Sequence, residues 1–271
     1  MIHWKSGFQP GQAYVMLGRC QKLQDIHIVE STNKFDPKDI RVNEKAMEET
    51  ERLNYRFVEL KEKEESLFED NFTISYLNIR SLKSKVKDIQ DDEYLPISNI
   101  ISFGETWLNP NDDVQLDGFR GTQENIGRGK GLSAFIKLDI NLNWEKISHD
   151  TFSVIFMRTE ILDVLFLYLS DGFDWQKLKE LFDIWIDKKR CVAVMGDTNI
   201  DFLRKDHDIK TYMEKNNFAQ LVKKPTHEKG GLLDQVYVNE KLMERKPFCT
   251  QRSVYFSDHD VVVLHVPTIS K

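Results

Sequence analysis

Four polar residues in this sequence follow apolar segments at places where they could carry out chemistry. Asn78 closes FTISYLN on the same alternate face as its apolar residues, and Glu105 follows the glycine of IISFG. Asp197 directly follows the glycine of VAVMGDTN, and Asn199 lies two residues later. A buried carboxylate or amide without a partner costs about 1–3 kcal/mol, so we expect these side chains to share one. A divalent cation would satisfy several of them together.

A second set of polar residues lies near the C-terminus. Asp234 interrupts the apolar segment LLDQVYV, and Ser257, Asp258 and His259 precede the valines of DVVVLHV. A carboxylate within a strand needs a donor, and His259 is the natural partner of Asp234, because the carboxylate would fix the imidazole tautomer and favour its protonation. Taken alone, GDTN is also typical of an Asx turn, and SDHD of a polar turn that opens a strand. The combination of all these residues favours a catalytic site.

The elements that would position these residues are mainly strands. From Phe72 onward, turn residues separate short apolar segments typical of β-strands, namely FTISYLNI, NIISFGETW, GLSAFIKL, FSVIFMRTEI, VLFLYLS, CVAVMGD, LLDQVYV and DVVVLHV. Residues 175–188 have one apolar face at helical spacing. Several strands are almost continuously apolar, which indicates sheets covered on both faces. The pattern therefore predicts an α/β fold built of layered sheets.

Residues 70–271 resemble the endonuclease/exonuclease/phosphatase superfamily, and within it the apurinic-type endonuclease domains of non-LTR retrotransposons and related mobile elements. The motifs that carry the resemblance are LNIRSL, ETWL, LYLS, GDTNID, PTH, LDQVYV and SDH. The resemblance implies a four-layer α/β sandwich of two packed mixed β-sheets flanked by helices. The loop after LYLS lacks the usual proline, RGKG replaces a run of glycines, and 199–234 looks shorter than in many relatives. These differences affect the loop geometry and the binding of substrate more than the chemical step.

The resemblance also implies a role for each motif residue. The catalytic residues would be Asp197, Asn199, His259, Asp234 and Tyr168. The metal ligands, for Mg²⁺ or alternatively Mn²⁺, would be Glu105, Asn78 and Asp258. The residues that contact substrate would be Thr226, Ser257 and Arg80. The implied reaction is hydrolysis of a DNA phosphodiester, in which Asp197 activates water, His259 stabilises the transition state, and the products carry 3′-hydroxyl and 5′-phosphate ends.

Alternative functions remain open at this stage. The same fold supports phosphoinositide phosphatases and RNA-cleaving enzymes with nearly the same catalytic set. A catalytically weak DNA-binding remnant is a further alternative from a different class, and the complete set of polar residues argues against it.

The N-terminal part of the chain has a different character. FQPGQAYVMLGRCQKLQDIHIV resembles the last motif of Pif1-type helicases, with Arg19 at the position of the nucleotide-contacting arginine, but no phosphate-binding loop precedes it. We therefore expect three segments: a helicase remnant at 1–35, a charged helical linker at 36–69, and the endonuclease-like domain at 70–271. This order resembles the end of a Helentron-type Helitron protein, so the chain would be a fragment whose partner is the rest of a helicase-containing transposon protein. The N-terminal part could instead act as an interaction arm.

Composition limits the remaining functional classes. The 271 residues are 40% hydrophobic and 11% aromatic, as in a folded globular protein, and no stretch is apolar enough to span a membrane. The net charge of −6 argues against DNA binding through bulk positive charge, but it does not argue against an enzyme whose acidic residues gather a divalent cation, because the metal would reverse the local sign. Three scattered cysteines and no signal peptide predict a nuclear or cytoplasmic protein.

Overall fold

The computed structural model describes residues 2–4, 28–30, 66–124 and 129–268. The chain divides into two compact units, 1–64 and 65–271.

In the first unit, strand β1 (Ile2–Trp4) pairs in parallel with strand β2 (Ile28–Glu30). The helicase-like motif lies almost entirely outside the described residues, as does most of the expected charged helix. Of that helix the structure describes residues 66–69, which are helical.

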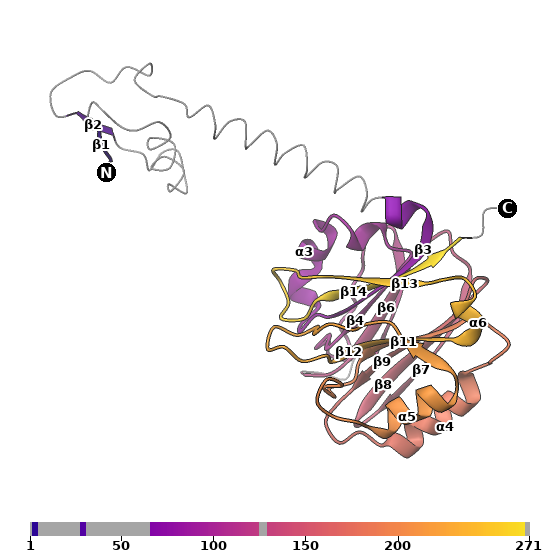
Figure 1. Cartoon of the computed structure of the whole chain (residues 1–271). Coiled ribbons are helices and arrows are strands. Elements are labelled where there is room, and N and C mark those ends of the chain that lie inside the picture. Colours follow the sequence, from indigo (N-terminus) through magenta and orange to yellow (C-terminus); the bar gives the residue numbers. More distant parts are fainter. Residues whose placement is uncertain (1, 5–27, 31–65, 125–128, 269–271) are drawn as a thin grey trace. The chain divides into compact units, whose positions relative to one another are not determined.

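The second unit contains two six-stranded mixed sheets (Figure 1). The first sheet has the order β13-β14-β3-β4-β6-β5, and its strands are β3 (Asn71–Asn78), β4 (Ile100–Gly104), β5 (Phe119–Glu124), β6 (Leu132–Lys137), β13 (Phe248–Arg252) and β14 (Val261–Pro267). The second has the order β11-β12-β10-β9-β8-β7, with β7 (Leu142–His149), β8 (Phe152–Thr159), β9 (Asp163–Leu169), β10 (Val192–Asp197), β11 (Phe218–Gln220) and β12 (Asp234–Asn239). In each sheet one pair of strands is parallel, β3 with β4 and β9 with β10.

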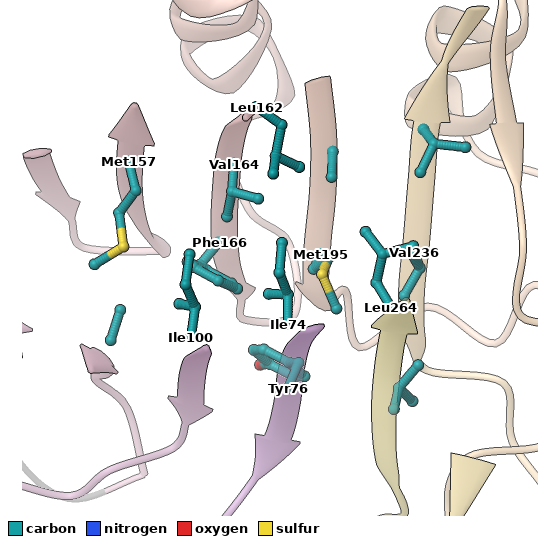
Figure 2. Packing of buried hydrophobic residues seen from close by; sticks show 14 of the residues in the cluster. Ile74, Tyr76, Ile100, Met157, Leu162, Val164, Phe166, Met195, Val236 and Leu264 are labelled. Atoms are coloured by element: carbon teal, nitrogen blue, oxygen red, sulfur yellow. The ribbon is translucent and has the colours of Figure 1, made fainter. Parts of the chain in front are cut away.

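The two sheets pack face to face through alternate side chains of their strands. Ile74 and Tyr76 of β3 and Ile100 of β4 belong to the same buried cluster as Phe166 of β9 and Met195 of β10. Figure 2 shows these side chains meeting between the two sets of strands. Because side chains alternate along a strand, Asn78 at the end of β3 lies on this inner face. The Asn78 side chain is buried and donates to Asp197 of the other sheet, so it lies on the face expected from the sequence.

Helices cover the outer faces. Helix α4 (Trp175–Trp185) buries Leu178, Phe182 and Trp185, and it packs with helix α5 (Asp208–Lys215) against the outer face of the second sheet. The side chain of Asp174 caps α4 by accepting a hydrogen bond from the Lys177 amide. The shorter helical elements are η3 (Lys83–Lys85), α3 (Val86–Gln90), η4 (Leu95–Ile97) and α6 (Glu240–Met243). Residues of α3 and η4 belong to the cluster on the outer face of the first sheet. The predicted α/β sandwich is thus confirmed.

The sequence did not predict strands β5, β7, β11 and β13, which are the four edge strands of the two sheets. An edge strand has neighbours on one side only, and its faces are less completely buried, so its sequence lacks a strong apolar pattern. In β7, for example, six of the eight residues are exposed.

The expected helix at 175–188 ends earlier, because Ile186 has an extended backbone. Among the described helices, none combines the length and apolar character needed to cross a membrane.

Candidate active site

The residues selected from the sequence come together at one end of the sandwich. Asn78 ends β3 and is the register partner of Gly104, which ends β4 just before Glu105. Asp197 ends β10, where its register partners are Asp234 on β12 and Tyr168 on β9. The strand ends of both sheets therefore contribute to a single cluster.

Asn78 connects the two sheets within this cluster. Its Nδ2 donates to Glu105 Oε1 at 3.0 Å and to Asp197 Oδ2 at 2.7 Å. Asn78 and Asp197 are both fully buried. A single amide thereby fixes the position of one carboxylate from each side of the site.

Asp197 is held in an environment that favours its protonated form. Burial, followed by the nearby charge of Asp234, raises the pKa of Asp197 to about 7, although His259 and the hydrogen bonds from Asn199 and Asn78 act in the opposite direction. The Asn199 amide donates to Asp197 Oδ1 at 2.8 Å, and Asn199 Nδ2 donates to the Leu169 carbonyl at 2.6 Å. A carboxylate with a pKa near neutrality is suited to accept a proton during a reaction.

Asp234 and His259 form the pair expected from the sequence. Nδ1 of His259 lies 2.8 Å from Asp234 Oδ2, and both residues are buried. Burial lowers the pKa of His259, but the charge and hydrogen bond of Asp234, with the charges of Asp197 and Asp258, outweigh it and raise this pKa to about 9. The imidazole is therefore protonated at neutral pH, and Asp234 fixes Nδ1 as a donor.

The hydroxyls of Thr226 and Ser257 form hydrogen bonds with backbone groups in this structure. Thr226 Oγ1 accepts hydrogen bonds from the amides of Leu233 and Asp234 at 3.2 and 3.0 Å, and Thr226 is 1% exposed. Ser257 Oγ donates to the Asn78 carbonyl at 2.6 Å and accepts from the His259 amide at 3.1 Å. Both hydroxyls thus position the residues beside them.

Tyr168 lies beside Asp197 in the sheet register. Its hydroxyl donates to the Gly129 carbonyl at 3.1 Å, and its pKa is raised by burial and by the charges of Glu105 and Asp197. The phenol is therefore neutral and able to donate a hydrogen bond.

Arg80 and Asp258 form an ion pair at the mouth of the cluster. Arg80 Nε also lies 3.9 Å from Glu105 Oε2. Burial raises the pKa of Asp258, but the Arg80 guanidinium outweighs this effect and lowers it overall.

A further residue, His227, was not selected from the sequence. Its Nε2 lies 3.4 Å from Asp258 Oδ2, and its ring meets the ring of His259 edge to face at 4.7 Å between centroids. His227 follows Thr226 in the PTH motif, which was the available signal.

The backbone around the site adopts conformations that are rare for residues other than glycine. Arg80, Glu105, Trp107 and Asn199 have φ values of 45°, 48°, 55° and 52°. Such conformations each cost of the order of 1 kcal/mol or more and persist only where the surrounding structure enforces them. Gly196, at φ 152°, is required because a Cβ there would lie 1.9 Å from the Leu167 carbonyl oxygen.

The oxygen atoms of the cluster fit a hard divalent cation. Asn78 Oδ1 and Asp258 Oδ1 are buried and, among the described residues, have no hydrogen-bond partner. The Glu105 carboxylate, which accepts from Asn78 Nδ2 and shares Arg80 as a neighbour with Asp258, offers further oxygen atoms, and carboxylate and amide oxygens are the ligands that Mg²⁺ prefers. Two groups that include His259, one with His227 and Asp258 and one with Asp197 and Asp234, also bring potential ligand atoms within 4.8 Å of one another. Mg²⁺ prefers oxygen ligands to imidazole nitrogen, so Glu105, Asn78 and Asp258 are the better candidates for the expected metal.

Comparison with known proteins shows similarity in structure. No family model and no curated protein matches the sequence. The endonuclease domain of TRAS1, a telomere-specific non-LTR retrotransposon, matches with a TM-score of 0.55 and 14% identity over 73% of this chain and 98% of that chain. An AP endonuclease from Archaeoglobus fulgidus matches with a TM-score of 0.58 and 16% identity over 73% and 100%. TDP2 of D. rerio, complexed with a single strand DNA product, matches with a TM-score of 0.53 and 10% identity over 73% and 99%. The fold is therefore the endonuclease/exonuclease/phosphatase fold.

Proposed function

We propose that this chain is a divalent-cation-dependent phosphodiesterase that nicks DNA and leaves 3′-hydroxyl and 5′-phosphate ends. The observation that carries the proposal is one buried cluster in which Asp197, Asp234 and His259 bring polar side-chain atoms within 4.8 Å of one another, with His259 Nδ1 held 2.8 Å from Asp234 Oδ2. Phosphodiester hydrolysis needs a group that accepts a proton from water and a group that stabilises charge on the phosphate oxygens. Asp197 and His259 are suited to these two roles.

Other residues of the cluster assist these two. Asn199 holds Asp197 Oδ1 through its amide, which leaves the carboxylate oriented for the attacking water. Asp234 holds the His259 ring, so that its second nitrogen is directed away from Asp234 and is available to the phosphate. The neutral hydroxyl of Tyr168 and the exposed part of Arg80 would add contacts to phosphate oxygens.

The cation would be held by Glu105, Asn78 and Asp258. When bound, Mg²⁺ or Mn²⁺ would act as a Lewis acid that neutralises charge on the phosphate and on the departing oxygen.

DNA is the substrate that the comparisons favour. The matched structures include two endonucleases and an enzyme with a DNA product bound. We further propose that the chain derives from a mobile element, acts in the nucleus or cytoplasm, and belongs with a helicase-containing transposon protein. The TRAS1 match supports the first of these, and the sequence of residues 1–35 supports the last.

Plasmid nicking tests the proposal. Purified protein is incubated with supercoiled plasmid and Mg²⁺, with and without chelator, beside Asp197→Ala and His259→Ala variants. Asp206→Ala provides a matched control, because Asp206 is exposed and its ion-pair partner among the described residues is Lys210 on the surface. We expect the wild type and the control to nick alike and the two site variants to lose activity.

The same preparation should be tested on RNA and on phosphoinositides. A wild type that nicks no better than Asp197→Ala would overturn the proposal and favour a DNA-binding remnant. Cleavage of either alternative substrate in preference to DNA would retain the chemistry but change the substrate.

A further inference from the structure

Arg80 occupies an unusual place beside two carboxylates expected to bind the cation. Its guanidinium pairs with Asp258, and its Nε lies 3.9 Å from Glu105 Oε2. The Glu105 and Asp258 side chains are only 17% and 14% exposed, whereas that of Arg80 is 50% exposed. The arginine therefore reaches from solvent onto a pair of carboxylates that are largely removed from water.

The backbone fixes Arg80 relative to Glu105. Arg80 has a φ of 45°, and the amide of the next residue, Ser81, donates to the Glu105 carbonyl at 2.9 Å. The two residues thus lie on strained turns that are joined to each other. A conformation that is rare for an arginine is maintained where its side chain faces both carboxylates.

The charges explain what Arg80 does in this position. Two partly buried carboxylates need a neighbouring positive charge, because desolvation and mutual repulsion disfavour their ionised forms. Arg80 supplies that charge here. A divalent cation bound by the same carboxylates would supply it instead and would repel the guanidinium.

On the premise of the proposed function, we infer that Arg80 and the divalent cation compete for the carboxylates of Glu105 and Asp258. Arg80 offsets one of the two negative charges in the cation-free protein, and cation binding releases its guanidinium toward a substrate phosphate. Arg80 therefore weakens cation binding when no DNA is present and couples the cation to DNA binding.

Cation titration without DNA tests the inference. Mn²⁺ binding is measured by electron paramagnetic resonance and calorimetry for the wild type, Arg80→Gln and Arg80→Lys. Lys83→Gln is the control, because Lys83 is 70% exposed and pairs with Asp112. We expect Arg80→Gln to bind Mn²⁺ about tenfold more tightly, the effect of removing one charge near a divalent ion in a partly screened setting. Arg80→Lys and Lys83→Gln should stay within about threefold of the wild type.

Two results would overturn the inference in distinguishable ways. If the wild type binds Mn²⁺ but Arg80→Gln binds it equally or more weakly, the competition is refuted and the proposed function stands. If neither protein binds Mn²⁺, the proposed function itself fails. Thermal denaturation of each cation-free variant establishes that the proteins compared are folded.

Discussion

Replacement of Asp234 by asparagine should move the whole pH range of activity toward acid. The negative charge of Asp234 raises the pKa of both Asp197 and His259. On the proposed mechanism, activity requires ionised Asp197, with a pKa of about 7, and protonated His259, with a pKa of about 9. We therefore expect a bell-shaped pH profile with its maximum near pH 8. Loss of the Asp234 charge lowers both pKa values, so the acidic and the alkaline limbs of the pH profile both move to lower pH.

The size of the effect follows from these values. At pH 8, a pKa of about 9 leaves roughly 90% of His259 protonated. Without the Asp234 charge, burial still lowers this pKa while Asp197 and Asp258 still raise it. At the ordinary imidazole pKa of about 6.5, roughly 3% of the ring would remain protonated at pH 8. Activity at pH 8 should then fall about 30-fold from this cause alone. Part of the loss should be recovered near pH 6, where the imidazole regains its proton.

The assay is initial-rate nicking of supercoiled plasmid between pH 5.5 and 10 at constant ionic strength, with the His259 resonance followed by NMR in parallel. Asp260→Asn is the matched control, since it removes the same charge from the residue next to His259, whereas the charges that chiefly raise the pKa of His259 are those of Asp234, Asp197 and Asp258. The reasoning is refuted if Asp234→Asn retains an alkaline limb near pH 9. It is also refuted if the control moves the profile by the same amount.

Three other perturbations have clear expected outcomes. Gly196→Ala would place a Cβ 1.9 Å from the Leu167 carbonyl oxygen, at a residue whose φ is 152°. We therefore expect the free energy of unfolding to fall by about 2 kcal/mol or more, and the Tm in a thermal melt to fall by at least about 4 °C. Asp163→Asn removes a fully buried carboxylate that binds Arg158 and Arg190. Urea denaturation should show a free energy of unfolding lower by about 2–3 kcal/mol, a loss that is moderated because both guanidiniums are partly exposed. A free energy of unfolding within about 0.5 kcal/mol of the wild type would contradict this role. Removal of divalent cations by EDTA should abolish nicking, and added Mg²⁺ or Mn²⁺ should restore it; activity that persists in EDTA would exclude the oxygen ligand set.

The sequence was most informative where one residue differs from an otherwise regular pattern. Asp234 stands out in an apolar strand, and its need for a donor identifies His259 as the partner found in the structure. Alternation along β3 likewise places Asn78 on the inner face with Tyr76. In each case the free-energy cost of burying a polar group identified the residue as unusual from the sequence alone.

The contacts that could not be predicted depend on how loops approach the strand ends. The ion pair of Arg80 with Asp258 joins residues 178 positions apart, and both lie just beyond strands where no periodic pattern applies. The position of His227 against His259 depends on an isolated bridge between two such segments. Edge strands such as β7 were not predicted for a related reason, since exposure removes the apolar alternation on which strand prediction depends.

On the proposed mechanism, nicking depends on how the two sheets are stacked, because the hydrogen bond from Asn78 to Asp197 joins them. Asn78 belongs to one sheet and Asp197 to the other, and the bond of 2.7 Å spans the boundary between them. A slight sliding of one sheet over the other would break it while each sheet kept its own backbone hydrogen bonds. On gradual heating, nicking activity should therefore decline several degrees before the circular dichroism of the strands changes. Substitutions in the shared core, such as Met195→Ala, should widen that interval.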